Sequence, residues 1–205
     1  MKRIMLLVVA LFAGSSSLSA QSAQTSDVAV WMTASKFDDP NLFFEEEEIA
    51  SFEFDEEVGY GVSFNHFWTS AFSTEVAYHT LGASLGVSIE NSPRFHVGDV
   101  EASSLSGVAQ WHFRRATRFS PYVGIGAAYV QGEFEPGEAV DESFSFDPEV
   151  DVVFNAGANI ALTDSLAVGI DVKHISWAPK AENDEEAERL DVSPLLMSAG
   201  LRYRF

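Results

Sequence analysis

From about Val28 to its last residue, the chain alternates between apolar and polar positions in a series of short segments. This period of two places successive side chains on opposite faces of an extended chain, so it predicts β-strands. Residues 150–162 show it most clearly, because Val152 and Phe154 belong to an apolar face and Asn155 to a more polar one. The same division recurs along the chain and predicts an all-β protein.

Eight segments follow this pattern, and each is long enough for a tilted membrane crossing of about 9–11 residues. They are residues 27–37, 56–67, 72–82, 102–114, 120–133, 149–162, 165–177 and 193–205. Long connections at 38–55, 83–101, 134–148 and 178–192 alternate with short ones near 68–71, 115–119 and 163–164. This alternation predicts an eight-stranded antiparallel transmembrane β-barrel of up-and-down topology, with short periplasmic turns, long extracellular loops and both termini in the periplasm.

A soluble β-sandwich is the main alternative, because it also has many alternating strands. The last residues favour the barrel. Leu201, Tyr203 and Phe205 share an apolar face that reaches the end of the chain, which suits a final strand facing lipid. We interpret these three residues as an assembly signal for the barrel-assembly machinery.

The first residues predict export. Two basic residues precede an apolar run at 4–13 and a Ser-rich stretch that ends in small residues, which is the order of a cleavable signal peptide. The run is about half the ~20 residues that a spanning helix needs. Residues 1–20 are therefore the predicted signal and 21–205 the mature barrel, with cleavage after either Ser19 or Ala20.

Composition agrees with a barrel in the bacterial outer membrane. Hydrophobic residues make up 46% of the chain and aromatic residues 13%, although the net charge is -19. A barrel accommodates both, because its strands have an apolar outer face while its loops and lumen are polar. The acidic balance argues against nucleic acid as a partner. With no cysteine, stability depends on the sheet and its packing. No cofactor is indicated.

Particular segments resemble a known family. Residues 109–113 and 119–129 are similar to the fourth strand, turn and fifth strand of the OmpW family of small outer-membrane barrels, and 189–191, 197–200 and 203–205 resemble its last strand. The resemblance implies a narrow, mainly hydrophobic channel. Small apolar permeants would cross the lipopolysaccharide-containing outer leaflet through it and be released sideways into outer-membrane lipid by passive diffusion.

The first long loop departs from that family, because residues 43–48 are more acidic than its pattern. Residues 38–57 contain ten Asp or Glu and no Lys or Arg, and residues 134–149 contain six and none. Clustered carboxylates can bind Ca²⁺ or Mg²⁺ weakly. A solvated acidic surface is the simpler interpretation, because neither loop has the ligand spacing of an EF-hand. A structural or receptor barrel, whose acidic loops bind a partner, is one alternative function.

A set of polar residues falls on the inward phase of the predicted strands. They are Glu75, His79, Gln110, His112, Arg114, Asp151, Asn155, Asn159, Asp171, Lys173, Arg202 and Arg204. Charges inside a narrow barrel must be paired, so this set predicts a structural network that closes the lower lumen rather than an ion pathway. His79 and His112 have no evident third ligand, so no metal site is predicted.

One motif suggests an enzyme as a second alternative. His174 and Ser176 share the outward phase of their strand, with Glu188 in the following segment. The pair resembles the His-x-Ser of the PagL family of outer-membrane lipid A esterases, in which Ser, His and Glu act together. The match fails at Trp177, where that family has Asn. An aromatic girdle that includes Trp177 is the preferred interpretation, and no catalytic residue is assigned.

Gly124-Ile125-Gly126 has two of the glycines of a nucleotide-binding loop, but the third glycine and the helix are missing. We expect these glycines to provide room for neighbouring groups on a crowded barrel face.

Overall fold

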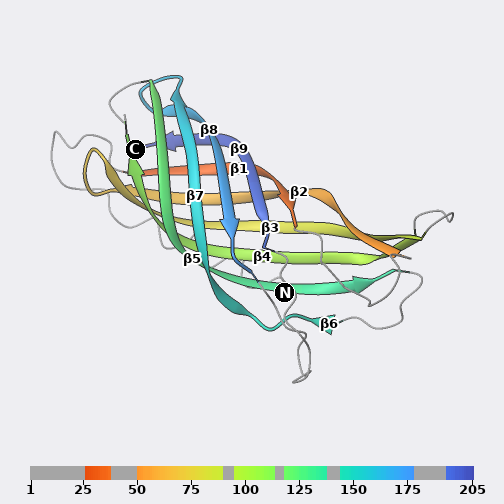
Figure 1. Cartoon of the computed structure of the whole chain (residues 1–205). Coiled ribbons are helices and arrows are strands. Elements are labelled where there is room, and N and C mark those ends of the chain that lie inside the picture. The colour runs from red at the N-terminus through yellow and green to blue at the C-terminus, as the bar shows by residue number, and fades with distance from the viewer. Residues whose placement is uncertain (1–25, 38–49, 90–94, 114–117, 138–143, 178–192) are drawn as a thin grey trace.

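The computed structural model describes residues 26–37, 50–89, 95–113, 118–137, 144–177 and 193–205 (Figure 1). The strands are β1 (Ser26–Lys36), β2 (Ala50–Phe67), β3 (Phe72–Ile89), β4 (Phe95–His112), β5 (Phe119–Pro136), β6 (Phe144–Ser145), β7 (Glu149–Ala161), β8 (Leu166–Ile175) and β9 (Leu195–Arg204). No helix within these ranges is long and apolar enough to cross a membrane. The predicted signal peptide lies outside them.

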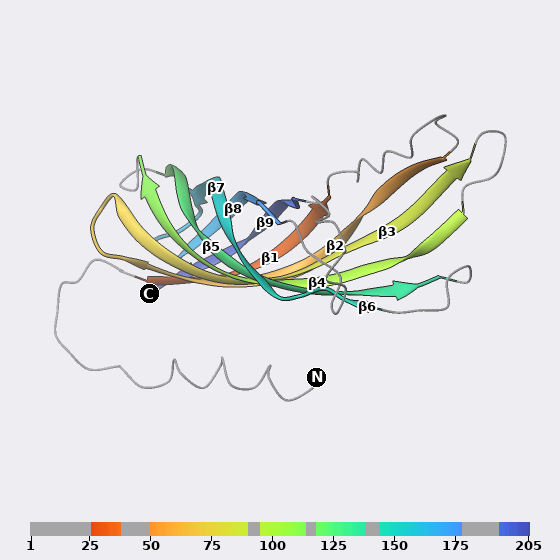
Figure 2. The ribbon, with the colours of Figure 1, turned by 60° about the horizontal axis from the view of Figure 1, so that its bottom comes forward.

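The sheet closes on itself. Successive strands pair antiparallel from β1 to β5 and from β7 to β9, β5 pairs with β7, and β1 pairs with β9. Figures 1 and 2 show β8, β9 and β1 side by side. Ser26 and Phe205 exchange backbone hydrogen bonds of 3.3 and 2.9 Å, so both ends of the barrel chain lie at one rim. We call this rim, which also has the short turns, the turn end, and the opposite rim the loop end.

β6 and β7 are two parts of one interrupted strand. Val130 of β5 pairs with Glu149, whereas Glu133 pairs with Ser145, so the register changes by one residue between the two pairings. This is a β-bulge, and its Phe146 donates a backbone hydrogen bond of 2.9 Å to β5. Counting β6 and β7 together, the prediction of an eight-stranded antiparallel up-and-down barrel is confirmed.

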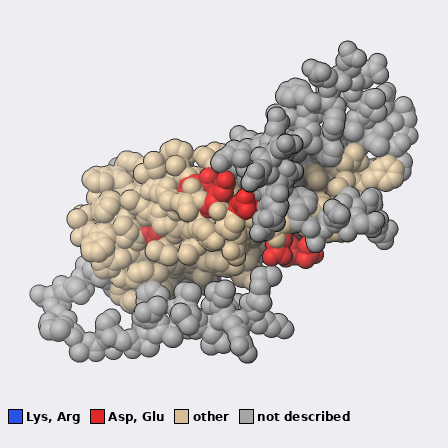
Figure 3. Space-filling model, turned by 90° about the horizontal axis from the view of Figure 1, so that it is seen from below, with Lys and Arg blue, Asp and Glu red and all other residues tan. Residues whose placement is uncertain are grey.

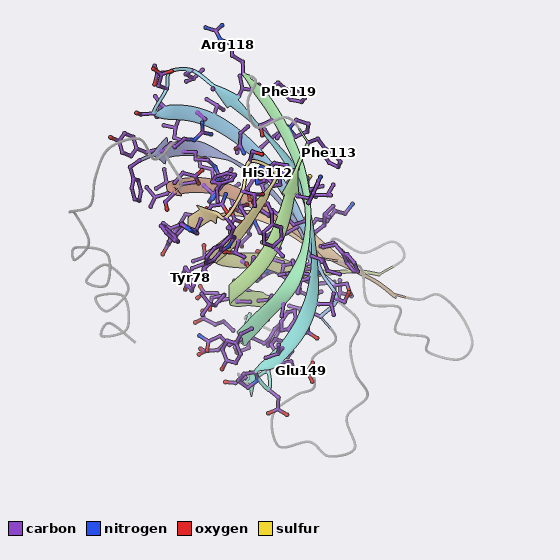
Figure 4. The ribbon with its side chains drawn as sticks, turned by 90° about the vertical axis from the view of Figure 1, so that its left-hand side faces the viewer. Tyr78, His112, Phe113, Arg118, Phe119 and Glu149 are labelled. Carbon is purple, nitrogen blue, oxygen red and sulfur yellow. The ribbon has the colours of Figure 1, made fainter. Side chains whose placement is uncertain are left out.

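The two faces of the wall differ as the alternation predicts. Outward side chains are apolar, among them Val30, Tyr60 and Ile125, while inward side chains include both polar groups and a buried hydrophobic cluster. Phe113 and Phe119 project outward near the turn end, where an aromatic belt would meet the membrane interface (Figure 4). Figure 3 shows one side of the barrel, with an uncharged wall and most visible acidic residues toward the loop end.

Four strands are longer than the alternation predicts. β2, β3, β4 and β5 have 18 residues each, whereas β1 has 11, β7 13, and β8 and β9 10 each. Parts of the expected loops 38–55, 83–101 and 134–148 are therefore strand. In these extensions outward positions such as Glu101 and Glu135 are charged and exposed. Backbone pairing continues there without an apolar outer face, so the wall is tall along β2–β5 and short elsewhere.

The close approach of β4 and β5 depends on Gly126. A Cβ atom at this position would overlap the carbonyl oxygen of Gly107 and lie 2.8 Å from Cα of Val108, whereas a Cβ on Gly107 would meet nothing within 4 Å. We expect Gly126→Val to lower the free energy of unfolding by about 1–3 kcal/mol, because β5 must move away from β4. Gly107→Val is the matched control and should change it by less than about 0.5 kcal/mol. Urea unfolding in lipid vesicles, followed by tryptophan fluorescence, measures both, and equal losses would contradict the explanation.

Candidate functional site

The barrel lumen divides into a charged part and an apolar part along its length. On β3 the inward side chains run from Glu75 through His79 to Leu81, and on β8 from Lys173 to Ile175. Each strand thus changes from polar to apolar in the direction of the loop end. We call the two parts the polar tier and the apolar tier.

Five ionised side chains form the centre of the polar tier. Arg202 of β9 contacts Asp27 of β1 and lies 3.2 Å from Glu75 of β3. Lys173 of β8 lies 3.1 Å from the other oxygen of Glu75 and also contacts Asp171. All five are almost fully buried. Three carboxylates and two cations alternate in one chain across the lumen, so each charge has an opposite neighbour in place of the water it has lost.

Neutral groups extend this chain to the opposite wall. The Tyr122 hydroxyl of β5 and the Asn155 amide of β7 donate to Oδ2 of Asp171, at 2.6 and 2.7 Å. Gln110 of β4 in turn donates to Asn155 at 2.9 Å. The polar tier therefore joins side chains of β1, β3, β4, β5, β7, β8 and β9 across the barrel.

Trp31 of β1 supports the tier from the neighbouring wall. The Arg202 guanidinium carbon lies 5.4 Å from the centre of its indole ring, which is a cation–π distance. The indole Nε1 donates to the Ser63 hydroxyl of β2 at 3.0 Å. The indole ring thus packs against the guanidinium group of Arg202, while the guanidinium nitrogens bind the carboxylates of Asp27 and Glu75.

The apolar tier is a cluster of buried hydrophobic side chains. Its members are Phe37, Leu81, Ala83, Val100, Ala102, Val108, Ala128, Val130, Phe134, Phe146, Val153, Ile175, Trp177 and Leu196. Trp177, just after β8, packs edge-on against Phe146 of the bulge at 5.6 Å between ring centres, and lies 6.5 Å from Phe37. The three rings come from the end of β1, the bulge and the end of β8. They line the loop end of the lumen beside the short wall.

The structure places most of the predicted lumen residues inside the barrel. Buried side chains are those of Glu75, His79, Gln110, His112, Asn155, Asn159, Asp171, Lys173 and Arg202. Asp151 and Arg204 are half-buried near opposite rims, and Arg114 lies outside the described residues. His112 hydrogen-bonds the Ser73 hydroxyl at 2.9 Å. Within the described ranges, no three potential ligands come together as a metal site.

The prediction missed two members of the polar tier, Asp27 and Tyr122. Both had a usable signal, because they occupy the inward phase of predicted strands and alternate with the outward Val28 and Val123. What the pattern could not provide is the contact between Asp27 and Arg202, because those residues are 175 positions apart and meet only when the barrel closes.

The placement of Trp177 in an outer aromatic girdle is wrong. Its side chain is 1% exposed and belongs to the apolar tier, because it continues the inward phase of Lys173 and Ile175. His174 is half-buried and Ser176 exposed on the other side of the strand. Among the described residues no hydrogen bond joins this pair, and Glu188 lies outside them. The esterase interpretation gains no support from this geometry.

The charge chain provides a test of what stabilises the barrel. We expect Arg202→Met to lower the free energy of unfolding by about 3–5 kcal/mol, because Asp27 would stay buried without its cation. Adding Asp27→Asn should recover part of that loss, since it removes the orphaned charge. Arg118→Met, at an exposed turn position labelled in Figure 4, is the matched control and should have little effect. Urea titration in vesicles would refute the role if the two arginine variants behaved alike.

Comparisons with known proteins agree with this geometry. The chain is similar to the outer membrane protein OprG from Pseudomonas aeruginosa, with a TM-score of 0.68, 14% identity, and coverage of 89% of this chain and 97% of that one. It is also similar to the outer membrane protein AlkL, with a TM-score of 0.59, 19% identity, and coverage of 92% and 94%. Neisserial surface protein A gives a TM-score of 0.61 at 14% identity, covering 90% and 100%.

These structural matches show the shared barrel fold. No curated protein sequence matches the chain significantly. The family assignment comes from a separate finding, a family model described as OmpW family, which matches residues 16–205. This range includes every described strand and both tiers of the lumen. The chain therefore belongs to the OmpW family of outer-membrane β-barrels.

Proposed function

We propose that this barrel is a passive channel for small hydrophobic molecules, which enter the apolar tier from the loop end and leave sideways into the membrane. The turn end would then face the periplasm. The observation that carries this proposal is the division of the lumen. A buried apolar cluster lies toward the loop end, and a charge network that spans the barrel lies toward the turn end.

The polar tier argues against passage along the whole axis. An eight-stranded barrel has an interior that side chains can fill or that holds one small ligand. Here Arg202, Lys173 and Tyr122 are among the largest fully buried side chains. An apolar solute would have to separate buried charge pairs and would offer them no new partners, which costs several kcal/mol. The apolar tier, in contrast, favours such a solute by about 25 cal/mol for each Å² of apolar surface removed from water.

The seam between β1 and β2 is our candidate for the exit. The ladder between these strands ends at the pair Ser35 and Glu57, close to the end of β1. On its other side, β2 has a register shift against β3 between Glu56 and Gly61. Near Glu57, β2 is thus held by fewer regular hydrogen bonds to both of its neighbours. This is also where the short strand β1 ends beside the longer β2. Val58, which is 70% exposed, marks the outer face of this seam.

Uptake of apolar solutes into vesicles tests the channel. Purified barrel should increase the uptake of a fluorescent apolar solute over that of empty vesicles. Val153→Asn puts an amide into the apolar tier and should reduce uptake about fivefold to tenfold, because the amide is costly to keep dry beside an apolar solute. Ser120→Asn, an inward position near the turn end, is the control and should leave uptake unchanged. No uptake by the folded wild-type barrel would refute the proposal.

A pair of engineered disulfides tests the exit. The chain contains no cysteine, and Ala34 faces Val58 across the seam. Oxidised Ala34→Cys with Val58→Cys should block most uptake, and reductant should restore it, because the bond locks the end of β1 to β2. Val28→Cys with Phe64→Cys joins the same strands six positions nearer the turn end, in the same type of pair, and should leave uptake intact. Equal effects of both locks would place the exit elsewhere.

A further inference from the structure

His79 is a buried polar group at the boundary of the two tiers. Its side chain is 1% exposed, and neither ring nitrogen has a hydrogen-bond partner among the described residues. The next inward side chain on β3 is Leu81, a member of the apolar tier. The charged groups that act on the ring are Lys173, Asp171 and Glu75 of the polar tier. His79 therefore forms the floor of the apolar tier and the top of the polar one.

The backbone of β2 is shaped to hold this ring. Gly61 pairs with His79 across the β2–β3 ladder, immediately after the register shift. A Cβ atom at Gly61 would overlap Cδ2 of the imidazole and lie 2.8 Å from Nε2. Glycine at this position leaves room for the Cδ2–Nε2 edge of the ring beside β2, although neither ring nitrogen has a hydrogen-bond partner among the described residues.

An unpaired buried imidazole is unusual, because buried polar groups almost always have a partner. A neutral imidazole offers one N–H donor and one acceptor nitrogen. The charge of the nearby Lys173 is already balanced by Glu75 and Asp171 within the polar tier. A hydrogen-bonding group that reaches this floor through the apolar tier would find His79 free to bind it.

We infer that His79 binds the neutral polar head of a permeant whose apolar body lies in the apolar tier. This inference rests on the proposed channel and narrows its substrate class to small amphipathic molecules with a hydroxyl or carbonyl group, such as medium-chain alcohols, aldehydes or ketones. A hydroxyl suits the ring best, because it can donate to one nitrogen or accept from the other. A pure alkane would leave the imidazole unpaired.

Ionised heads are disfavoured at this position. A carboxylate or ammonium would lose its hydration on entering the lumen, which costs several kcal/mol unless a free counter-charge is present. The three carboxylates and two cations of the polar tier are already paired with one another. His79 thus selects for a neutral head.

Binding of three eight-carbon probes to the folded barrel in lipid nanodiscs tests this inference. The probes are octane, 1-octanol and octanoate, and binding is followed by tryptophan fluorescence, corrected for probe uptake by empty nanodiscs. We expect 1-octanol to bind about tenfold more tightly than either other probe. In ¹⁵N-histidine spectra, 1-octanol should shift one pair of ring-nitrogen signals that octane leaves in place.

Variants assign the effect to this side chain. His79→Phe should remove the shifted signals and bind 1-octanol no more tightly than octane, while its affinity for octane stays within about twofold. His79→Gln keeps a donor and an acceptor and should retain part of the preference. Ser120→Ala removes another buried hydroxyl with no partner among the described residues, near the turn end, and should leave the preference intact. Heat-modifiable migration in gels verifies that each variant is folded.

The outcomes separate this inference from the channel itself. If wild-type barrel binds octane and 1-octanol equally, or if His79→Phe keeps the preference, the role of His79 is refuted and the apolar channel stands. If no probe binds and vesicle uptake is also absent, the proposed function fails together with the inference.

Discussion

In a bilayer every backbone N–H and C=O group needs a partner within the protein, and this requirement dictates the rest of the structure. The pairing of β1 with β9 satisfies it by removing both sheet edges. A barrel that closes with eight strands has a narrow interior, in which there is room for side chains and little else. Charged residues that enter such an interior must find one another, as Arg202, Asp27 and Glu75 do. The polar tier is thus a consequence of closure as much as a support for it.

The same narrowness separates the two properties of the lumen. Near the turn end, the wall carries charges that hold strands together across the barrel. Toward the loop end, small residues such as Ala83 and Ala128 alternate with rings and branched side chains, and no ion pair is needed. The change occurs within one step along β3, between His79 and Leu81. An apolar solute that moves from the loop end toward the turn end would therefore reach a charged lining within one step, at the His79 imidazole and its charged neighbours.

The sequence predicts the faces of the strands well and their lengths poorly, for a physical reason. Side chains that face lipid are mostly apolar. The alternation of apolar and polar residues therefore predicts that Glu75 and Lys173 point inward, as the structure shows. In the extensions, Glu101 and Glu135 face outward while their strands remain paired, and the hydrophobic pattern does not indicate backbone pairing there. Contacts across the lumen depend on how the strands are staggered when the sheet closes. That stagger is absent from any single segment, which is why the contact between Asp27 and Arg202 could not be predicted.

The unequal height of the wall gives the barrel a front and a back. A cylinder of uniform height would present the same profile to every neighbour in the membrane. Here the 18-residue strands β2–β5 stand on one side and the strands of 10 to 13 residues on the other. Rotation of the molecule about the membrane normal therefore changes which neighbouring lipids and proteins face its low side. In a crowded outer membrane, the contacts of the barrel depend on this rotational orientation.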